Sequence, residues 1–261
     1  AAKGLRVTLD HLGEDTSDLA AARSTTAAYE QLFARLGAGG LACSTEASVK
    51  LSAVGQFLGK DGKKIALEQA RQICRAAEAV RSTVTLDMED HSTTDSTLDI
   101  LGELRADFPW VGAVLQAQLR RTEGDCADLA TSGSRVRLCK GAYAEPSSAA
   151  YPDKSGVDSS YVRCLKVLLR GAGYPMIATH DPRLIAIATQ LISANGRDAG
   201  SQEFQMLHGI RPDEQQRIAA AGNIMRVYLP YGDQWYGYFM RRLAERPANV
   251  GFFLRSLLSR S

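Results

Sequence analysis

The sequence predicts a single-domain α/β protein with the (β/α)8, or TIM-type, barrel fold, and three observations favour it. Short runs rich in β-branched residues alternate with stretches of helical spacing, and eight such pairs follow one another. Several strand candidates are apolar on both sides of the pleat, as parallel strands covered by helices must be. The chain has 261 residues, and about 250 residues is typical of this barrel. A doubly wound open sheet is the alternative.

The predicted strands are spaced evenly along the chain. In order they are LRVTLDHL (5–12), ASVKLS (47–52), TVTLDME (83–89), VGAVLQA (111–117), RVRLCKG (135–141), PMIATH (175–180), EFQML (203–207) and NIMRVYLP (223–230).

Each strand is followed by a stretch of helical spacing or helix-forming composition. The clearest helices are predicted at 66–81, 158–173 and 213–222. Gly171 and Gly173 precede the sixth strand and Gly222 precedes the eighth, where helix stop signals are expected. No linker, low-complexity segment or internal repeat divides the chain, so we expect one domain over residues 1–261.

Composition excludes several classes of protein. Hydrophobic residues make up 45% of the chain and charged residues 23%, which is typical of a globular protein with a sizeable core. The net charge is +2 and no Lys/Arg run occurs, so no nucleic-acid partner is expected. No apolar run is long enough to span a bilayer, and the first residues show no signal-peptide pattern. The five cysteines form no CxxC pair, so we expect a reducing, cytoplasmic location without disulfides.

GAGGLA (37–42) matches the loose GxGxxA form of the dinucleotide-binding fingerprint. It follows a predicted helix and precedes a predicted strand, which is the wrong order for a phosphate-binding turn. We interpret it as a helix-to-strand connection.

Polar side chains gather where the predicted strands end, and all four histidines lie at or just past such an end. In chain order these residues are Asp10, His11 and Glu14; Lys50, inside the second strand; Asp87, Glu89, Asp90 and His91; Gln116 and Gln118; Arg137, Lys140 and Tyr143; Thr179, His180 and Asp181; Gln205 and His208; and Tyr228.

These residues predict an active site, because (β/α)8 barrels place their chemistry at the C-terminal ends of the strands. Single members have simpler explanations: Lys50 can extend to the rim, Thr179–Asp181 can cap a helix, and we interpret His11 and His208 as structural. Burying Lys50, Asp87 or Arg137 without a partner would cost several kcal/mol each, so these must pair with one another or with a ligand.

The residue types indicate an organic ligand and not a metal. HExxH, Walker, GxSxG and two-His-one-carboxylate patterns are absent from the sequence. The Arg, Lys, Gln and Thr side chains, with Gly141, suit a large anionic heterocycle with many hydrogen-bonding edges. The adjacent Arg241 and Arg242 in the predicted last helix would offer forked donors to a carboxylate.

Several motifs together resemble the proline dehydrogenases, the flavin-dependent enzymes that begin proline catabolism. The motifs are SVKLSAVG, LDMEDH, VRLCKGAYAEP, IATHD, EFQMLHG and RVYLPYGDQWYGYFMRRLAERPAN, in the family's order and at similar spacing over nearly the whole chain. The resemblance is to the monofunctional bacterial form, since the fused form needs a following aldehyde dehydrogenase domain. The chain opens on Ala-Ala, without Met and without the family's helices ahead of the barrel, so earlier residues are expected in the native chain.

The resemblance implies oxidation of L-proline to 1-pyrroline-5-carboxylate by hydride transfer from C5 to FAD, the first step of proline degradation to glutamate. Asp87 and Arg137 match the residues treated as catalytic. Lys50, Tyr228, Tyr238, Arg241 and Arg242 match the substrate pocket, with the arginine pair on an eighth helix that covers the site. Glu14 matches a gating glutamate that pairs with the first arginine. The FAD contacts would be Met88, Gln116, Arg137, Lys140, Gly141, Ala142, Tyr143, Lys154, Thr179, His180, Gln205, Leu207 and Glu245.

The resemblance further implies a quinone as electron acceptor and peripheral contact with the inner face of the membrane. We expect Asp87 to hold Lys50 and the arginines in place, and the ring of Tyr228 to reject a hydroxyl on proline carbon 4. Two other functions stay open on residues alone: a Schiff-base aldolase or lyase that uses Lys50 or Lys140, and a non-catalytic barrel that binds a small acid.

Overall fold

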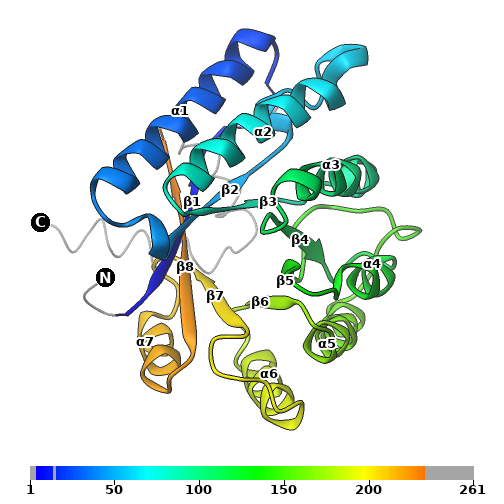
Figure 1. Ribbon diagram of the computed structural model, residues 1–261. Helices are drawn as coiled ribbons and strands as arrows, with labels where there is room; N and C mark the ends of the chain where they lie inside the picture. Colours follow the sequence, from blue (N-terminus) through cyan, green and yellow to red (C-terminus); the bar gives the residue numbers. More distant parts are fainter. Residues whose placement is uncertain (1–3, 14–15, 233–261) are drawn as a thin grey trace, which may run out of the picture.

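The computed structural model describes residues 4–13 and 16–232. In this part of the chain eight parallel strands close into a barrel in chain order, from β1 to β8, and helices surround it (Figure 1). Pairing of β1 with β8 closes the barrel, which confirms the TIM-type fold and excludes the open sheet.

The strands lie close to their predicted positions. They are β1 (Arg6–His11), β2 (Thr45–Val49), β3 (Thr83–Leu86), β4 (Gly112–Gln116), β5 (Arg135–Cys139), β6 (Tyr174–Ala178), β7 (Glu203–Leu207) and β8 (Ile224–Tyr231). The second strand begins and ends earlier than predicted, so placing Lys50 inside it was wrong: Lys50 follows the last residue of β2. Arg137 lies in the middle of β5 and not at its end.

Seven α-helices and four short 3-10 turns connect the described strands. The helices are α1 (Leu19–Ala38), α2 (Gly62–Ala79), α3 (Thr94–Asp107), α4 (Thr122–Leu129), α5 (Lys154–Arg170), α6 (Pro182–Ala194) and α7 (Pro212–Ala220), and the turns are η1 (Ala42–Ser44), η2 (Ser52–Val54), η3 (Gly59–Asp61) and η4 (His91–Thr93). The GAGGLA stretch holds the last turn of α1 and the chain that leads to β2, as predicted.

Aspartates begin three of the helices immediately after strand-to-helix loops. The side chains of Asp18, Asp153 and Asp181 accept hydrogen bonds from the backbone N–H groups of Ala21, Gly156 and Arg183. Each bond satisfies a donor that a first helical turn leaves without an intrahelical partner. Since these loops carry the polar strand-end residues, the caps also fix the rim of the barrel.

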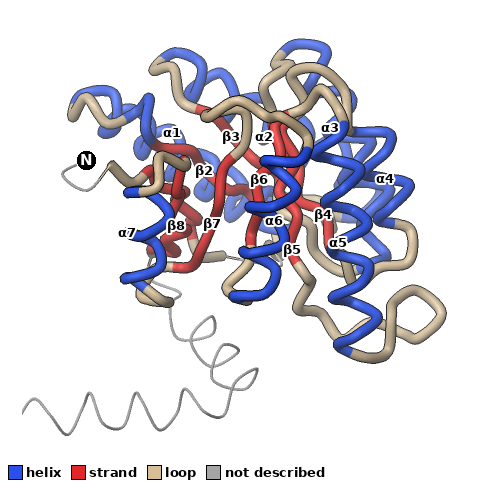
Figure 2. The backbone as a smooth tube through the Cα atoms, turned by 90° about the horizontal axis from the view of Figure 1, so that it is seen from below, coloured by secondary structure: helices blue, strands red, loops and turns tan. Residues whose placement is uncertain are grey.

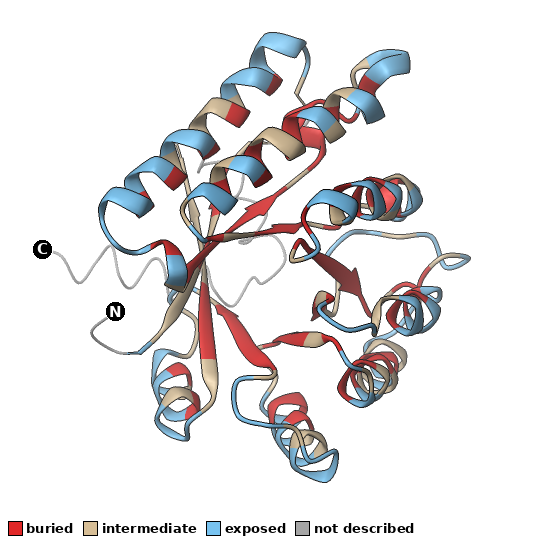
Figure 3. Cartoon of the chain, viewed as in Figure 1, coloured by how far each residue is buried: buried red, intermediate tan, exposed pale blue. Residues whose placement is uncertain are grey.

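The hydrophobic core lies between the strands and the helices. One cluster packs α1, α2 and α3 against β2 to β4, and a second packs α4 to α7 against β4 to β8. Figure 3 shows the pattern: the helices are buried along the side facing the barrel and exposed outside, while the strands are buried over most of their length. In Figure 2 the strands occupy the centre and the helices the outside.

The interior of the barrel is polar, unlike the layers of branched apolar side chains that usually fill this fold. Glu46 on β2 pairs with Arg137 on β5, and Arg137 also bonds to Gln205 on β7. These strands are not neighbours in the barrel order, so the bonds cross the interior. Gly112 on β4 leaves room for the Thr85 hydroxyl, which donates to Glu46, because a Cβ at Gly112 would lie 2.6 Å from Thr85 Oγ1.

Candidate active site

Arg137 is the central residue of the site. It is 4% exposed, and each of its guanidinium nitrogens has an acceptor. Nε donates to Gln205 Oε1 at 2.6 Å and Nη2 to Glu46 Oε1 at 2.6 Å. Nη1 donates to Ser48 Oγ at 2.8 Å and to Asp87 Oδ1 at 2.9 Å. Burial alone would lower the pKa of Arg137, but the carboxylates of Glu46 and Asp87 outweigh burial and raise it.

Asp87 follows β3 and accepts three hydrogen bonds. Oδ1 accepts from Ser48 Oγ at 2.6 Å and from Arg137, while Oδ2 accepts from the Tyr228 hydroxyl at 2.9 Å. A carboxylate with these donors holds Ser48, Arg137 and Tyr228 in place. The expectation that Asp87 also holds Arg241 and Arg242 concerns residues outside the described part of the chain.

Tyr228 approaches Asp87 and Arg137 from β8. Its hydroxyl donates to Asp87, and the Arg137 guanidinium lies 5.4 Å from the centre of its ring. Burial and the carboxylates of Asp10 and Asp87 raise the pKa of Tyr228 well above its usual value of 10.0. The phenol is therefore a hydrogen-bond donor at neutral pH.

Lys50 pairs with Asp10 at the end of β1. Its ammonium donates to both carboxylate oxygens, at 3.2 and 3.1 Å. Among the described contacts Asp10, and not Asp87, is thus the hydrogen-bond partner of Lys50, which corrects our expectation. Burial raises the pKa of Asp10 more than the Lys50 ammonium lowers it.

The two histidines that we interpreted as structural have different surroundings. The ring of His11 packs edge-on against Tyr29 and Tyr231, with ring centres 5.9 and 5.2 Å away. The side chain of His208 is exposed, and its backbone N–H donates to the carbonyl of Tyr228. His11 therefore fits a packing role, and His208 presents its ring to solvent.

Polar side chains and one methionine lie at the ends of β3 and β4. Gln116 is buried and its Nε2 donates to the backbone carbonyl of Glu89 at 2.6 Å. The Glu89 carboxylate in turn accepts from the hydroxyl and the backbone N–H of Ser52. Met88 is also buried. These contacts connect the ends of β2, β3 and β4.

The loop after β5 carries Gly141, Ala142 and Tyr143. Gly141 has a φ of +104°, and a Cβ there would lie 2.3 Å from Cδ of Gln118. Only glycine tolerates both conditions. Tyr143 is 40% exposed, and its carbonyl accepts from Gln118 Nε2 at 3.3 Å. The backbone of this loop therefore lies close to the end of β4.

Two carboxylates and three cations form an ion cluster on the rim. Lys140 donates to Asp158 at 2.5 Å and to Asp181 at 3.1 Å. Lys154 and Arg183 contact the same two carboxylates. Despite partial burial, the bonds to these cations lower the pKa of Asp158 and Asp181 below the usual 3.8. The cluster joins the loops after β5 and β6 to α5.

Thr179, His180 and Leu207 connect the ends of β6 and β7. The backbone N–H of Leu207 donates to His180 Nε2 at 2.9 Å, so this nitrogen is unprotonated. Thr179 is buried, and its hydroxyl accepts from the Asp181 N–H at 3.1 Å.

The structure thus brings the described site residues to one end of the barrel. Glu14, Tyr238, Arg241, Arg242 and Glu245 lie outside the described residues, as does the predicted eighth helix.

The sequence did not lead us to Glu46 and Ser48, which hold Arg137 from β2. A signal for them was present: Glu46, Ser48 and Lys50 alternate along the chain and therefore point to one face of the strand. We considered mainly strand ends, whereas these residues lie deeper in the barrel.

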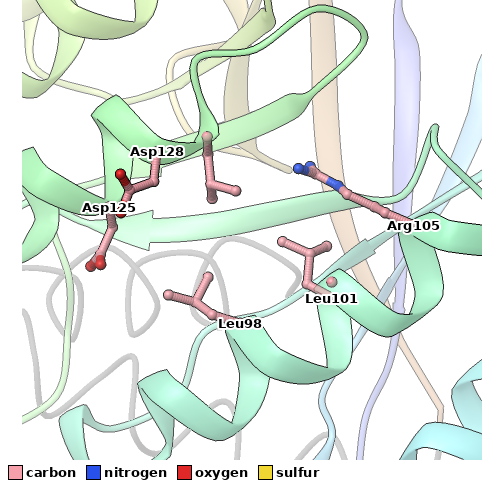
Figure 4. A pocket seen from close by; sticks show the side chains of 7 residues that line it. Leu98, Leu101, Arg105, Asp125 and Asp128 are labelled. Atoms are coloured by element: carbon pink, nitrogen blue, oxygen red, sulfur yellow. The ribbon is translucent and has the colours of Figure 1, made fainter.

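A cavity of about 210 Å³ lies elsewhere, between α3 and α4 in the outer layer of helices (Figure 4). It is lined by Leu98, Leu101, Gly102, Arg105, Asp125, Asp128 and Leu129, and thus by none of the predicted site residues. The Arg105 guanidinium is engaged with the Val111 carbonyl and the Ser134 hydroxyl. The rest of the lining is three leucines, a glycine and two aspartates, of which Asp125 is paired with Arg121. Such a set does not form a reactive site.

Residues 4–13 and 16–232 lack two further features. In that range no cluster of three or more His, Cys, Asp or Glu side chains is arranged to hold a metal ion. No helix in the same range has the length and apolar character needed to cross a membrane.

Comparisons with known proteins agree with one another. Residues 1–255 match the family model described as "Proline dehydrogenase". "Proline dehydrogenase 2" of Bacillus subtilis (strain 168) is 40% identical over 255 residues, covering 98% of this chain and 82% of that protein. "Proline dehydrogenase" of Deinococcus radiodurans is 44% identical over 215 residues, covering 81% of this chain and 69% of that protein.

Solved structures of proline utilization A are similar in fold. The crystal structure from Bdellovibrio bacteriovorus, inactivated by N-propargylglycine, is 26% identical with a TM-score of 0.84, covering 93% of this chain. A Bradyrhizobium japonicum structure is 24% identical with a TM-score of 0.78, covering 95% of this chain. This chain spans only 30% and 29% of the lengths of those two proteins.

Proposed function

Because the chain belongs to the proline dehydrogenase family, we propose that it oxidises L-proline to 1-pyrroline-5-carboxylate as the first step of proline degradation. The observation that carries the proposal is the hydrogen-bonded group of Asp87, Arg137 and Tyr228. Asp87 follows the last residue of β3, at the end of the barrel where this fold has its chemistry, and it accepts from Arg137 inside β5 and Tyr228 inside β8. We also propose that residues 1–261 form one catalytic domain.

FAD is the cofactor that we propose, since oxidising a C–N bond needs a hydride acceptor and no protein side chain supplies one. The residues fit such a group. At Gly141 a Cβ would collide with Gln118, so the loop backbone lies closer to the end of β4 than any other residue would allow. Buried amides of Gln116 and Gln205 suit the edges of a heterocycle. The rim cluster has three cations for two carboxylates, and the surplus charge suits a diphosphate.

Lys50, Arg241 and Arg242 are the residues that we propose bind the proline carboxylate. Three cations around one carboxylate set the orientation of the substrate and lower the entropic part of the barrier. Their positive field also favours the neutral form of the substrate amine, from which hydride can leave. Asp10 keeps the Lys50 ammonium near the end of β2.

Arg137 and Asp87 act in this proposal as a preorganised charged pair. The fixed guanidinium stabilises negative charge that develops near it during the reaction, without having to reorient. Asp87 holds Arg137 and Tyr228 in place. Glu14 and the predicted eighth helix, which carries Arg241 and Arg242, would close over the substrate and exclude water.

The Schiff-base alternative gains nothing from the geometry. Lys50 and Lys140, the two lysines that it would use, are both engaged with carboxylates, at 3.1 and 2.5 Å. A nucleophilic lysine instead needs an apolar or cationic neighbourhood that favours the free amine.

Reduction of an artificial dye by L-proline tests the proposal directly. The purified chain with bound FAD should show flavin absorbance and reduce the dye only when proline is present. Lys50→Ala should raise the KM for proline at least tenfold, whereas Lys64→Ala, at an exposed position of α2, should not change it. An FAD-loaded protein that leaves both proline and the dye unchanged would contradict the proposal.

A quinone is the electron acceptor that we propose, reached through peripheral contact with the inner face of the membrane. A water-soluble quinone should replace the dye in the same assay. The protein should also sediment together with vesicles that contain a long-chain quinone.

A further inference from the structure

We propose that Glu46 is a positioning residue for the reaction, acting through Arg137. The proposal rests on the function proposed above, and it assigns a task to a carboxylate that lies below the site. Glu46 is on β2 and is 0% exposed. It lies two residues before Ser48 on the same face of the strand, and therefore deeper in the barrel.

Glu46 collects donors from four other strands. Its Oε1 accepts from Thr8 at 2.7 Å and from Arg137 at 2.6 Å, and Arg226 Nε lies 3.9 Å away. Its Oε2 accepts from Arg135 at 2.9 Å and from Thr85 at 3.2 Å, which completes the set. The three guanidinium groups outweigh the effect of burial and lower the pKa of Glu46, so the group is a carboxylate at neutral pH.

Arg137 is therefore held between two carboxylates at different depths. Asp87 follows the last residue of β3 and pulls Nη1 toward the end of the barrel. Glu46 is the second residue of β2 and holds Nη2 toward the opposite end. With Gln205 on Nε, the planar guanidinium has a partner along each edge, and its plane is fixed. Without Glu46, Asp87 would be the one carboxylate left on Arg137 among the described residues, and the guanidinium would turn toward the substrate side.

Glu203 on β7 shows that a buried carboxylate in this interior need not have that task. It is also 0% exposed and pairs with Arg226 through both oxygens, at 2.7 and 3.1 Å. Its contact with the Arg137 group is indirect, since it accepts from Gln205 Nε2. Glu203 is thus a matched control for the removal of an interior charge.

The experiment compares four variants in kcat, KM for proline, thermal midpoint and the dissociation constant of FAD from the flavin-free protein. Glu46→Gln removes the charge and leaves a guanidinium uncompensated, so it lowers the thermal midpoint. Glu46→Gln combined with Arg135→Met restores the charge balance. Glu46→Asp keeps the charge but withdraws it from Arg137. Glu203→Gln is the control.

The expected result separates positioning from stability. The charge-balanced double variant and Glu46→Asp regain most of the thermal midpoint, yet kcat stays lowered and the FAD dissociation constant stays raised. Each change is about tenfold, as expected for one lost charge-assisted hydrogen bond, and KM for proline stays within about twofold. Glu203→Gln keeps kcat and the FAD dissociation constant within about twofold of the parent values.

Two results would overturn the proposal. In one, the double variant recovers kcat and FAD affinity together with its thermal midpoint, so that Glu46 serves only charge balance. In the other, Glu203→Gln lowers kcat as much as Glu46→Gln does. Failure of the proposed function would look different: the parent protein would not oxidise proline, while the FAD dissociation constants would still compare the variants.

Discussion

Single side chains at the site are each held by two contacts. Tyr228 presents its ring to the Arg137 guanidinium and its hydroxyl to Asp87. Lys50 reaches past the end of β2 to a buried carboxylate, Asp10. Such double contacts restrict the rotamer of a side chain more than a single hydrogen bond does, and restricted rotamers are what preorganised sites require.

Tyr228 should decide between proline and 4-hydroxyproline. Replacing Tyr228 by Ser removes the ring that would meet a hydroxyl on carbon 4, so the ratio of kcat/KM for proline over hydroxyproline should fall roughly tenfold or more. Tyr228→Phe is the control, because it loses the hydroxyl and its bond to Asp87 but keeps the ring. Steady-state kinetics with both substrates measure the ratio. An unchanged ratio in Tyr228→Ser would show that another residue is the filter.

Loops between strands and helices carry most of the polar site residues, and their shapes depend on a few local requirements. The loop after β5 turns at Gly141 with a φ of +104°. The loop after β6 ends at Asp181, whose side chain begins α6 and also pairs with Lys140. The start of α6 thus holds the loop after the neighbouring strand, β5, in place.

Gly141→Ala should lower the free energy of unfolding by about 1–3 kcal/mol, because the new Cβ is strained at this φ and would collide with Gln118. Gly124→Ala is the matched control. A Cβ there meets no atom within 4 Å, and Gly124 lies in α4, so helix propensity should raise stability by roughly 0.5–1 kcal/mol. Urea unfolding of the two variants measures both changes. A Gly141→Ala variant as stable as the parent protein would contradict the argument.

Asp181 should stabilise α6 through its charge as well as through its cap. Asp181→Ala loses both and should cost about 1 kcal/mol for the cap alone. Asp181→Asn keeps a good capping side chain and loses the charge, so it should be intermediate at neutral pH.

The pH dependence separates the two contributions of Asp181. Its pKa is lowered below the usual 3.8 in the folded protein, so the charge stabilises the fold above that pH and the stabilisation is lost as the pH falls through and below it. The difference in thermal midpoint between the parent and Asp181→Asn should be constant between about pH 5 and 8 and should shrink in more acidic buffer. A constant difference down to the lowest accessible pH would refute the role of the charge.

At the scale of the whole molecule, closure of the barrel joins two hydrophobic clusters into one structure. The clusters lie on opposite sides of the barrel, around α1 to α3 and around α4 to α7, and share Leu98 and Leu129 at their borders. The β1–β8 pairing carries the continuity around the other side, and the Arg226 side chain adds a bond across it to the Val7 carbonyl at 3.0 Å.

Core truncations in either cluster should therefore destabilise the same unfolding transition. Leu104→Ala and Leu168→Ala remove buried leucines from the first and second clusters, and each should cost about 2–5 kcal/mol. Circular dichroism and tryptophan fluorescence should report one shared midpoint in each variant. Two transitions, with each variant shifting only one of them, would show that the two sides unfold independently.

The sequence by itself determined the strand count, the alternation of strands and helices and the end of the barrel at which the site residues gather. Hydrophobic periodicity and helix stop signals are local properties, which is why the strands at 83–89 and 203–207 were found within a few residues. Polar residue types within and just past the predicted strands were also enough to nominate Asp87, Arg137 and Lys50.

Only the tertiary structure decided which of these residues meet. It paired Lys50 with Asp10, which lies 40 residues away, and joined Arg137 to Glu46, 91 residues away and across the barrel. The period of a strand tells which side chains share a face, but the partner of an inward side chain depends on barrel closure and on the register of strands that are distant in the chain. For this reason the residues at the predicted strand ends did not indicate that Glu46 is the partner of Arg137.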